Sequence, residues 1–126
     1  MNEAFLNVEQ FRDFAEKINM SMAIFDVLIE RHRQRAEERF THEHDDRHIN
    51  GELAAAAACY TLASLPLSEQ KIAEYAASFL GPIWPWRWSM WKPKSPRENL
   101  VKAAAMMLAE IERLDRMVAD PGRSIA

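Results

Sequence analysis

Hydrophobic positions recur every three or four residues along most of the chain, which is the spacing of one face of an α-helix. The first run predicts a helix over residues 8–18, with the apolar positions Val8, Phe11, Phe14, Ala15 and Ile18. Asn19 is expected to interrupt the pattern, and a second helix is expected over residues 21–39. The same residues could also form one bent helix.

A third helix is expected from about Asn50, over the sequence GELAAAAACYTLASL. Its five consecutive alanines favour helix and let a neighbouring backbone approach closely. Pro66 ends this helix, and Ser68 is the expected N-cap of a fourth helix. That helix should stop at Gly81 and Pro82, because glycine and proline commonly follow a helix C-terminus.

The last helix has the clearest start, since Ser95, Pro96 and Glu98 form a capping box with proline at the first helical position. An apolar stripe then recurs at spacings of four and three, formed by Leu100, Ala104, Met107, Ile111, Leu114 and Val118. We expect this stripe to face the core as the spine of a helical bundle. An exposed remainder of it could support a dimer.

Composition agrees with an all-α fold, because only three glycines occur among 126 residues and β-branched residues are sparse. The prediction is one domain over residues 1–126, a compact bundle of four to five helices. A Trp- and Pro-rich loop, the segment IWPWRWSMWKPK, precedes the long C-terminal helix.

Charge and targeting signals narrow the function classes. The net charge of −3 argues against broad binding to nucleic acid, so any attraction to an anion must be local. Cys59 is the single cysteine, which excludes an intramolecular disulfide, and we expect it to be a buried, inert thiol. The N-terminal residues do not resemble a signal peptide, and no apolar run approaches the roughly 20 residues that span a bilayer. A cytoplasmic protein without a membrane partner is expected.

The sequence THEHDDRHINGEL, residues 41–53, is dense in histidines and acids. If a helix begins before Asn50, then Asp45, His48 and Glu52 share one face, with His44 beside them. Such a set could bind polar groups of a ligand, hold a divalent metal through Asp45, His48 and Glu52, or transfer protons. Alternatively, the Asn50-Gly51 turn breaks the helix and leaves these side chains capping or solvated.

A second acidic set, Glu110, Glu112 and Asp115, lies on the last helix. The spacing Glu112-x-x-Asp115 is that of all-α nucleotide pyrophosphohydrolases, but their pair of glutamates three apart on an earlier helix is missing. We therefore expect ordinary surface pairs, such as Glu112 with Arg116.

All four tryptophans fall within residues 84–91, and residues 83–97 contain no acid. Indole rings stack on nucleobases and nearby cations hold phosphates. The predicted stacking residues are Trp86, Trp88 and Trp91, and the predicted anion-binding residues are Arg87, Lys92, Lys94 and Arg97. The alternative is that this loop covers the open end of the bundle, with about two tryptophans in the core.

The sequences EHDDRHINGELAAAAACY and WPWRWSMWKPKSPRENLVKAAAMMLAEIERLDR together resemble a family of small, mostly uncharacterised proteins of phages, prophages and bacteria. The resemblance covers roughly residues 40–116, with Phe40 as the aromatic residue before the acidic motif. Residues 1–39 form a variable N-terminal part and residues 117–126 a tail. The resemblance implies a phage accessory protein, and it implies that the acid–histidine and tryptophan segments form one module with a shared pocket.

These observations favour a non-enzymatic binding protein of phage type that needs no cofactor. It would capture a small anionic, nucleotide-like ligand or a host defence protein. Two alternatives remain open: a metal-dependent nucleotide hydrolase, and a helical homo-oligomer that acts as a scaffold without a ligand.

Overall fold

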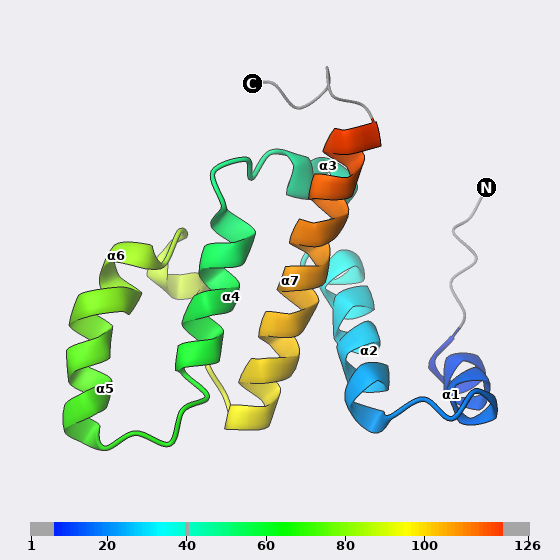
Figure 1. Ribbon diagram of the computed structural model, residues 1–126, viewed down its shortest axis with the longest axis horizontal. Coiled ribbons are helices and arrows are strands. Elements are labelled where there is room, and N and C mark those ends of the chain that lie inside the picture. Colours follow the sequence, from blue (N-terminus) through cyan, green and yellow to red (C-terminus); the bar gives the residue numbers. More distant parts are fainter. Residues whose placement is uncertain (1–6, 40, 120–126) are drawn as a thin grey trace.

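The computed structural model describes residues 7–39 and 41–119, and every regular element within them is helical, as the sequence predicts. In Figure 1, α4, α7 and α2 pack side by side, α5 lies beyond α4, and α1 projects beyond α2. The five longest helices are α1 (Val8–Lys17), α2 (Met22–Ala36), α4 (Glu52–Leu62), α5 (Glu69–Tyr75) and α7 (Pro96–Ala119). Shorter elements are α3 (His42–Asp46), α6 (Gly81–Ile83), a π-helical turn (Ala76–Leu80) and a 3₁₀ turn (Trp88–Met90).

The break between α1 and α2 lies where the sequence predicts it. Asn19 adopts a left-handed backbone conformation with φ of 57°, which ends helical geometry, and Ser21 then caps α2 by accepting a hydrogen bond from the Ile24 N–H. The two segments are therefore separate helices and not one bent helix. Phe40 and residues 120–126 of the predicted tail lie outside the described residues.

The fourth helix extends further than the sequence predicts. Ser68 caps α5 as expected, but the chain stays helical through the π-helical turn and α6 and ends at Ile83, beyond Gly81 and Pro82. Pro82 follows the π-helical turn, where the backbone already departs from the regular α-helical hydrogen-bond pattern.

The centre of the fold is the contact between α4 and α7, the most extensive contact between two elements of the described residues. Alanines lie on both sides of it, with Ala56 and Ala57 on α4 and Ala103 and Ala109 on α7, all of them buried. Small side chains allow the two backbones to approach closely, which confirms the role predicted for the alanine run. No helix in residues 7–39 and 41–119 is both long and apolar enough to cross a membrane.

The prediction that the apolar stripe of α7 faces the core is wrong. Leu100, Met107, Ile111 and Leu114 are 43–53% exposed, and Val118 is 80% exposed. The physical reason is that α4 presents alanines, so the small residues on the opposite face of α7 make the closer contact. The large side chains of the stripe are left on the outside.

Candidate functional site

The acid–histidine segment is positioned by α3 and by the turn that follows it. Thr41 caps α3 by accepting a hydrogen bond from the His44 N–H. Gly51, with φ of +80°, then separates α3 from α4, so of the two alternatives left open by the sequence the structure shows the break at Asn50-Gly51. The histidine and acidic side chains stay close together despite this turn, because α3 packs against α7 and holds His44 and Asp45 inward.

Asp45 is fully buried and is the charged centre of this segment. Its Oδ2 accepts a hydrogen bond from Arg31 Nη2 at 3.2 Å, and its Oδ1 accepts one from His44 Nδ1 at 3.0 Å. Arg31, itself 5% exposed, also donates to Glu112 Oε1 at 2.9 Å. Arg31 thus ties α2 to α3 and α7, and both oxygens of Asp45 are occupied.

His44 and His48 form a hydrogen-bonded pair next to this carboxylate. Their Nε2 atoms are 3.2 Å apart, and His48 Nδ1 lies 3.6 Å from Glu52 Oε2. One of the two Nε2 atoms donates to the other, and the tautomer decides which ring carries that proton. Burial lowers the pKa of His48, and the neighbouring His44 lowers it further, since two imidazolium ions cannot share this contact.

The predicted meeting of the two segments is present. The His48 ring contacts the Trp86 ring, with 5.5 Å between the ring centroids, although the residues are almost forty positions apart. Trp86 also packs edge-to-face on Trp84, which is buried among side chains of α4 and α7. The acid–histidine cluster, defined as Arg31, His44, Asp45, His48 and Glu52, is therefore continuous with the tryptophan segment.

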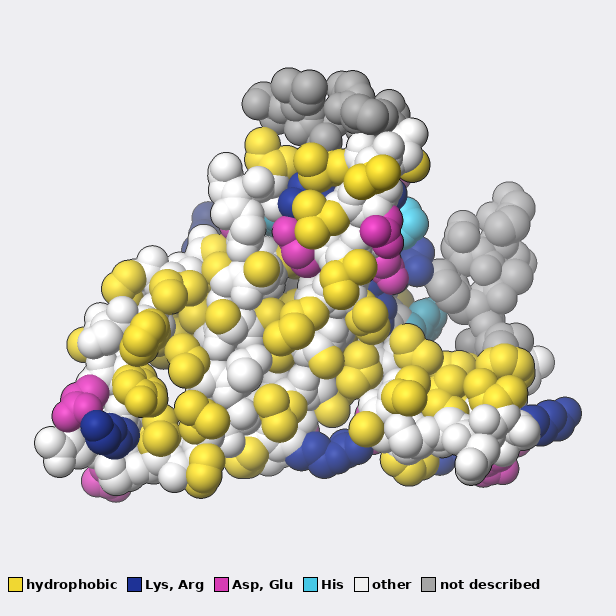
Figure 2. Space-filling view, in the orientation of Figure 1, with side chains coloured by type: hydrophobic (Ala, Val, Ile, Leu, Met, Phe, Trp, Pro, Cys, Tyr) yellow, Lys and Arg dark blue, Asp and Glu magenta, His cyan; other side chains and the backbone are white. Residues whose placement is uncertain are grey.

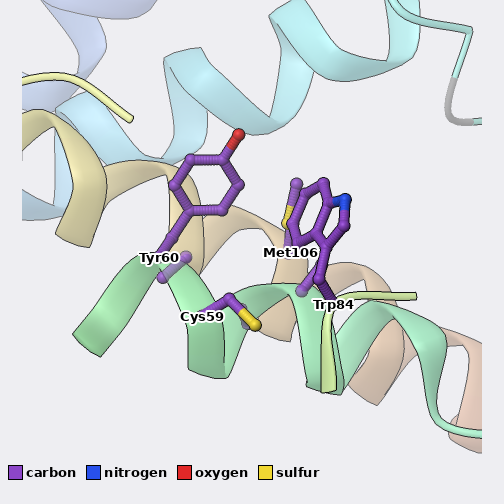
Figure 3. Close-up of a cluster of buried hydrophobic side chains, with 7 residues drawn as sticks. Cys59, Tyr60, Trp84 and Met106 are labelled. Carbon is purple, nitrogen blue, oxygen red and sulfur yellow. The ribbon is translucent and has the colours of Figure 1, made fainter. Parts of the chain in front are cut away.

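Tyr60 anchors the tryptophan segment to α4. Its ring contacts Trp84 and Trp91, at centroid distances of 5.8 and 4.6 Å, and its hydroxyl accepts the Lys92 N–H at 3.0 Å. Figure 3 shows Tyr60, Trp84 and Met106 as neighbours in the buried cluster between α4 and α7. Trp84 is thus a core residue, Trp86 and Trp91 are half-buried against the core, and Trp88 is 54% exposed.

A groove of about 600 Å³ lies between α2, the start of α7 and the Lys92–Lys94 stretch. Its α2 wall carries Glu30 and Arg33, which form a two-point ion pair at 2.7 and 2.8 Å. The opposite wall carries Lys92 and Lys94, both exposed, and neither ammonium group forms an ion pair within the described ranges. The α2 wall therefore has excess negative charge, because the single Arg33 is shared by Glu30, Glu37 and Glu38, and the opposite wall has excess positive charge.

Asn99 holds the Lys92–Lys94 wall of the groove in place, a role that was not predicted from the sequence. It is 2% exposed, its Oδ1 accepts the Lys94 N–H at 2.7 Å, and its Nδ2 donates to the carbonyls of Ala63 and Lys94. A polar residue within the buried face of α7 was the only available signal. Arg31 was also missed, because nothing local marks one arginine of a charged helix as buried.

The predicted site residues fall in connected but distinct places. His44, Asp45, His48, Glu52 and Trp86 form one contact chain. Lys92, Lys94 and Arg97 line the groove, where Arg97 pairs with Asp26 at 2.9 Å. Arg87 and Trp88 are exposed outside the residues lining the groove, and Trp91 faces Tyr60.

The residues proposed as metal ligands do not converge. His48 and Glu52 are neighbours, but Asp45 contacts the pair only through His44. Across residues 7–39 and 41–119, no three acid, histidine or cysteine side chains are arranged to hold one metal ion. The expected surface pair of Glu112 with Arg116 is also wrong: Glu112 binds Arg31, and Arg116 binds Asp46 at 2.8 Å.

The remaining predictions for this region concern Cys59 and the acids of α7. Cys59 is buried, as predicted, and burial raises the pKa of its thiol, which makes it a poor nucleophile. Glu110 binds Arg113 at 2.7 Å within α7.

No protein-family model, curated protein sequence or solved structure matches this chain.

Proposed function

We propose that this protein is a non-enzymatic, phage-type binding protein that captures a small anionic, nucleotide-like ligand in the groove between α2 and α7. One observation carries the proposal: Lys92 and Lys94 present ammonium groups without ion-pair partners along a groove of about 600 Å³. Ligand sites of small molecules commonly have volumes of about 300–1,000 Å³. The phage context rests on the sequence resemblance alone.

The two walls suit the two ends of such a ligand. A phosphate group would be held by Lys92 and Lys94, because charge-assisted hydrogen bonds to phosphate are strong and short. The amino groups of a base would donate to the carboxylates of Glu30, Glu37 or Glu38 on the opposite wall. Ile29 and Val101 supply apolar surface between them.

The acid–histidine cluster positions one wall of this groove through Arg31. Arg31 belongs to the same helix as Glu30 and Arg33, and its ion pairs with Asp45 and Glu112 fix the position of α2 relative to α7. In this proposal the cluster positions a wall of the groove and does not touch the ligand. That differs from the direct contacts expected from the sequence for Asp45, His48 and Glu52.

A host protein is the second candidate ligand, and the observation that favours it is Trp88. This indole is 54% exposed next to the exposed Arg87, and tryptophan and arginine are enriched among the central residues of protein interfaces. The hydrolase alternative has weaker support, because Asp45, His48 and Glu52 do not share a position for one ion.

The groove proposal predicts that ligand binding depends on the two lysines. A panel of nucleoside monophosphates and inorganic phosphate should contain a compound that raises the melting temperature. At a concentration tenfold above its Kd, this compound should stabilise the folded protein by about 1.4 kcal/mol. Calorimetry should show that the double variant Lys92→Ala/Lys94→Ala binds this compound about tenfold more weakly, or worse.

The matched control is Lys71→Ala on α5, an exposed lysine outside the groove, which should bind as the unaltered protein does. Melting curves that stay flat across the whole panel would count against an anionic small ligand and favour a protein partner. Turnover of a nucleotide that depends on a divalent ion would instead support the hydrolase.

A further inference from the structure

The outward stripe of α7 has the spacing of a helix-pairing seam. Successive members are separated by four, three, four, three and four residues, from Leu100 to Val118, which is the heptad pattern of a coiled coil. In heptad notation Ala104, Ile111 and Val118 occupy the a positions, and Leu100, Met107 and Leu114 occupy the d positions. The core of the monomer does not use this pattern, because its large members are exposed.

The seam borders an apolar groove on the same surface. This groove, of about 400 Å³, lies between α2 and α7 and is separate from the charged groove. Its lining is apolar throughout and includes Ile24, Val27 and Leu28 from α2 and Ala104, Met107 and Ile111 from α7. Figure 2 shows hydrophobic side chains gathered over α7 and between α7 and α2, with few charged side chains among them.

We propose that this face is a homodimer interface, in which α7 of a second copy lies antiparallel against α7 and the α2 groove. Knobs-into-holes packing joins helices that share the heptad spacing, and a second copy of this chain supplies such a helix. Two copies related by a two-fold axis would use the same surface twice, which is the commonest arrangement of soluble oligomers. The interface leaves the charged groove open, so it does not depend on the proposed ligand.

Side-chain size determines the antiparallel direction. In a parallel, in-register pair, Ala104 would face the Ala104 of the second copy and leave a gap in the seam. In the antiparallel pair, Ala104 faces Leu114 of the second copy, Met107 faces Ile111, and Leu100 faces Val118. Each layer then combines residues that fill the space between the helices.

The helix dipoles favour the same direction. In the antiparallel pair the N-terminus of each α7 lies beside the C-terminus of the other, which places opposite ends of the two dipoles together. Glu110 makes no repulsive contact with the second copy in either direction, because both of its oxygens bind Arg113 within its own helix.

The interface is tested by the mass of the protein in solution, measured by sedimentation equilibrium over a range of concentrations. The unaltered chain should have the mass of a dimer, and Ile111→Glu should raise its dissociation constant about 30-fold or more, because Ile111 is central in the seam. Ile18→Glu is the matched control: Ile18 is 52% exposed and lies outside the seam, so the dimer should persist. A monomer at every concentration would overturn the proposal and assign this face to another partner.

The direction is tested by oxidative cross-linking of cysteine variants, in which the buried Cys59 does not compete. A mixture of Ala104→Cys and Leu114→Cys chains should form a disulfide between unlike copies. Chains with Ala104→Cys alone should not cross-link to each other. Efficient cross-linking of Ala104→Cys chains to one another would overturn the antiparallel arrangement.

Discussion

Replacing Asp45 with asparagine is expected to lower the free energy of unfolding by about 3–5 kcal/mol, the cost of leaving one partner of a buried ion pair without the other. Asp45 is fully buried, and Arg31 would keep only Glu112, whose side chain is 44% exposed. His44 would also lose the carboxylate that accepts from its Nδ1. Chemical denaturation with urea measures this loss.

Asp46→Asn is the matched control, one position along the same helix. Asp46 pairs with Arg116, and both side chains keep partial contact with solvent, at 22% and 17% exposed, so the loss should be about 1 kcal/mol, smaller than for a fully buried carboxylate. The loss for Asp45→Asn should therefore exceed that for Asp46→Asn several-fold. Equal, small losses in the two variants would show that Asp45 is not the buried centre of the cluster.

The second large effect is expected for Trp84→Ala, which should lower the free energy of unfolding by about 3–5 kcal/mol. Trp84 is 7% exposed, contacts Tyr60 and Trp91, and donates from Nε1 to the Arg87 carbonyl at 3.1 Å. Truncation would leave a cavity where the tryptophan segment joins α4 and α7. Urea denaturation followed by circular dichroism measures the change.

Trp88→Ala provides the comparison within the same segment. Trp88 stacks on Trp84 from outside and remains 54% exposed, so its truncation should cost about 1 kcal/mol or less. A larger loss for Trp88→Ala than for Trp84→Ala would contradict the placement of these two rings.

Local signals predicted the helices well, because caps and breakers act within a few residues. Ser68 and Ser95 mark helix starts that the structure confirms, and Asn19 marks a break. The end of the fourth helix was missed at Gly81 and Pro82. The π-helical turn before them changes the hydrogen-bond pattern of the backbone, and no residue type in the sequence predicts such a turn.

Periodicity alone did not predict which face of α7 is buried. The large stripe and the small-residue face share helical spacing, and the choice between them is made by α4, whose alanines fit the small face. The buried ion pair between Arg31 and Asp45 was also beyond local reasoning, because its partners come from different helices. Clustering of His44 and His48 was predicted, but their contact arises from a turn and not from a continuous helix.

NMR tests the contact between the acid–histidine cluster and the tryptophan segment without perturbing either. A nuclear Overhauser spectrum of the aromatic protons should contain cross-peaks between the His48 ring and the Trp86 indole, whose centroids lie 5.5 Å apart. The Trp84–Trp91 pair, at 4.9 Å, serves as the internal reference. Cross-peaks for the reference pair without any between His48 and Trp86 would show that these two rings are not in contact.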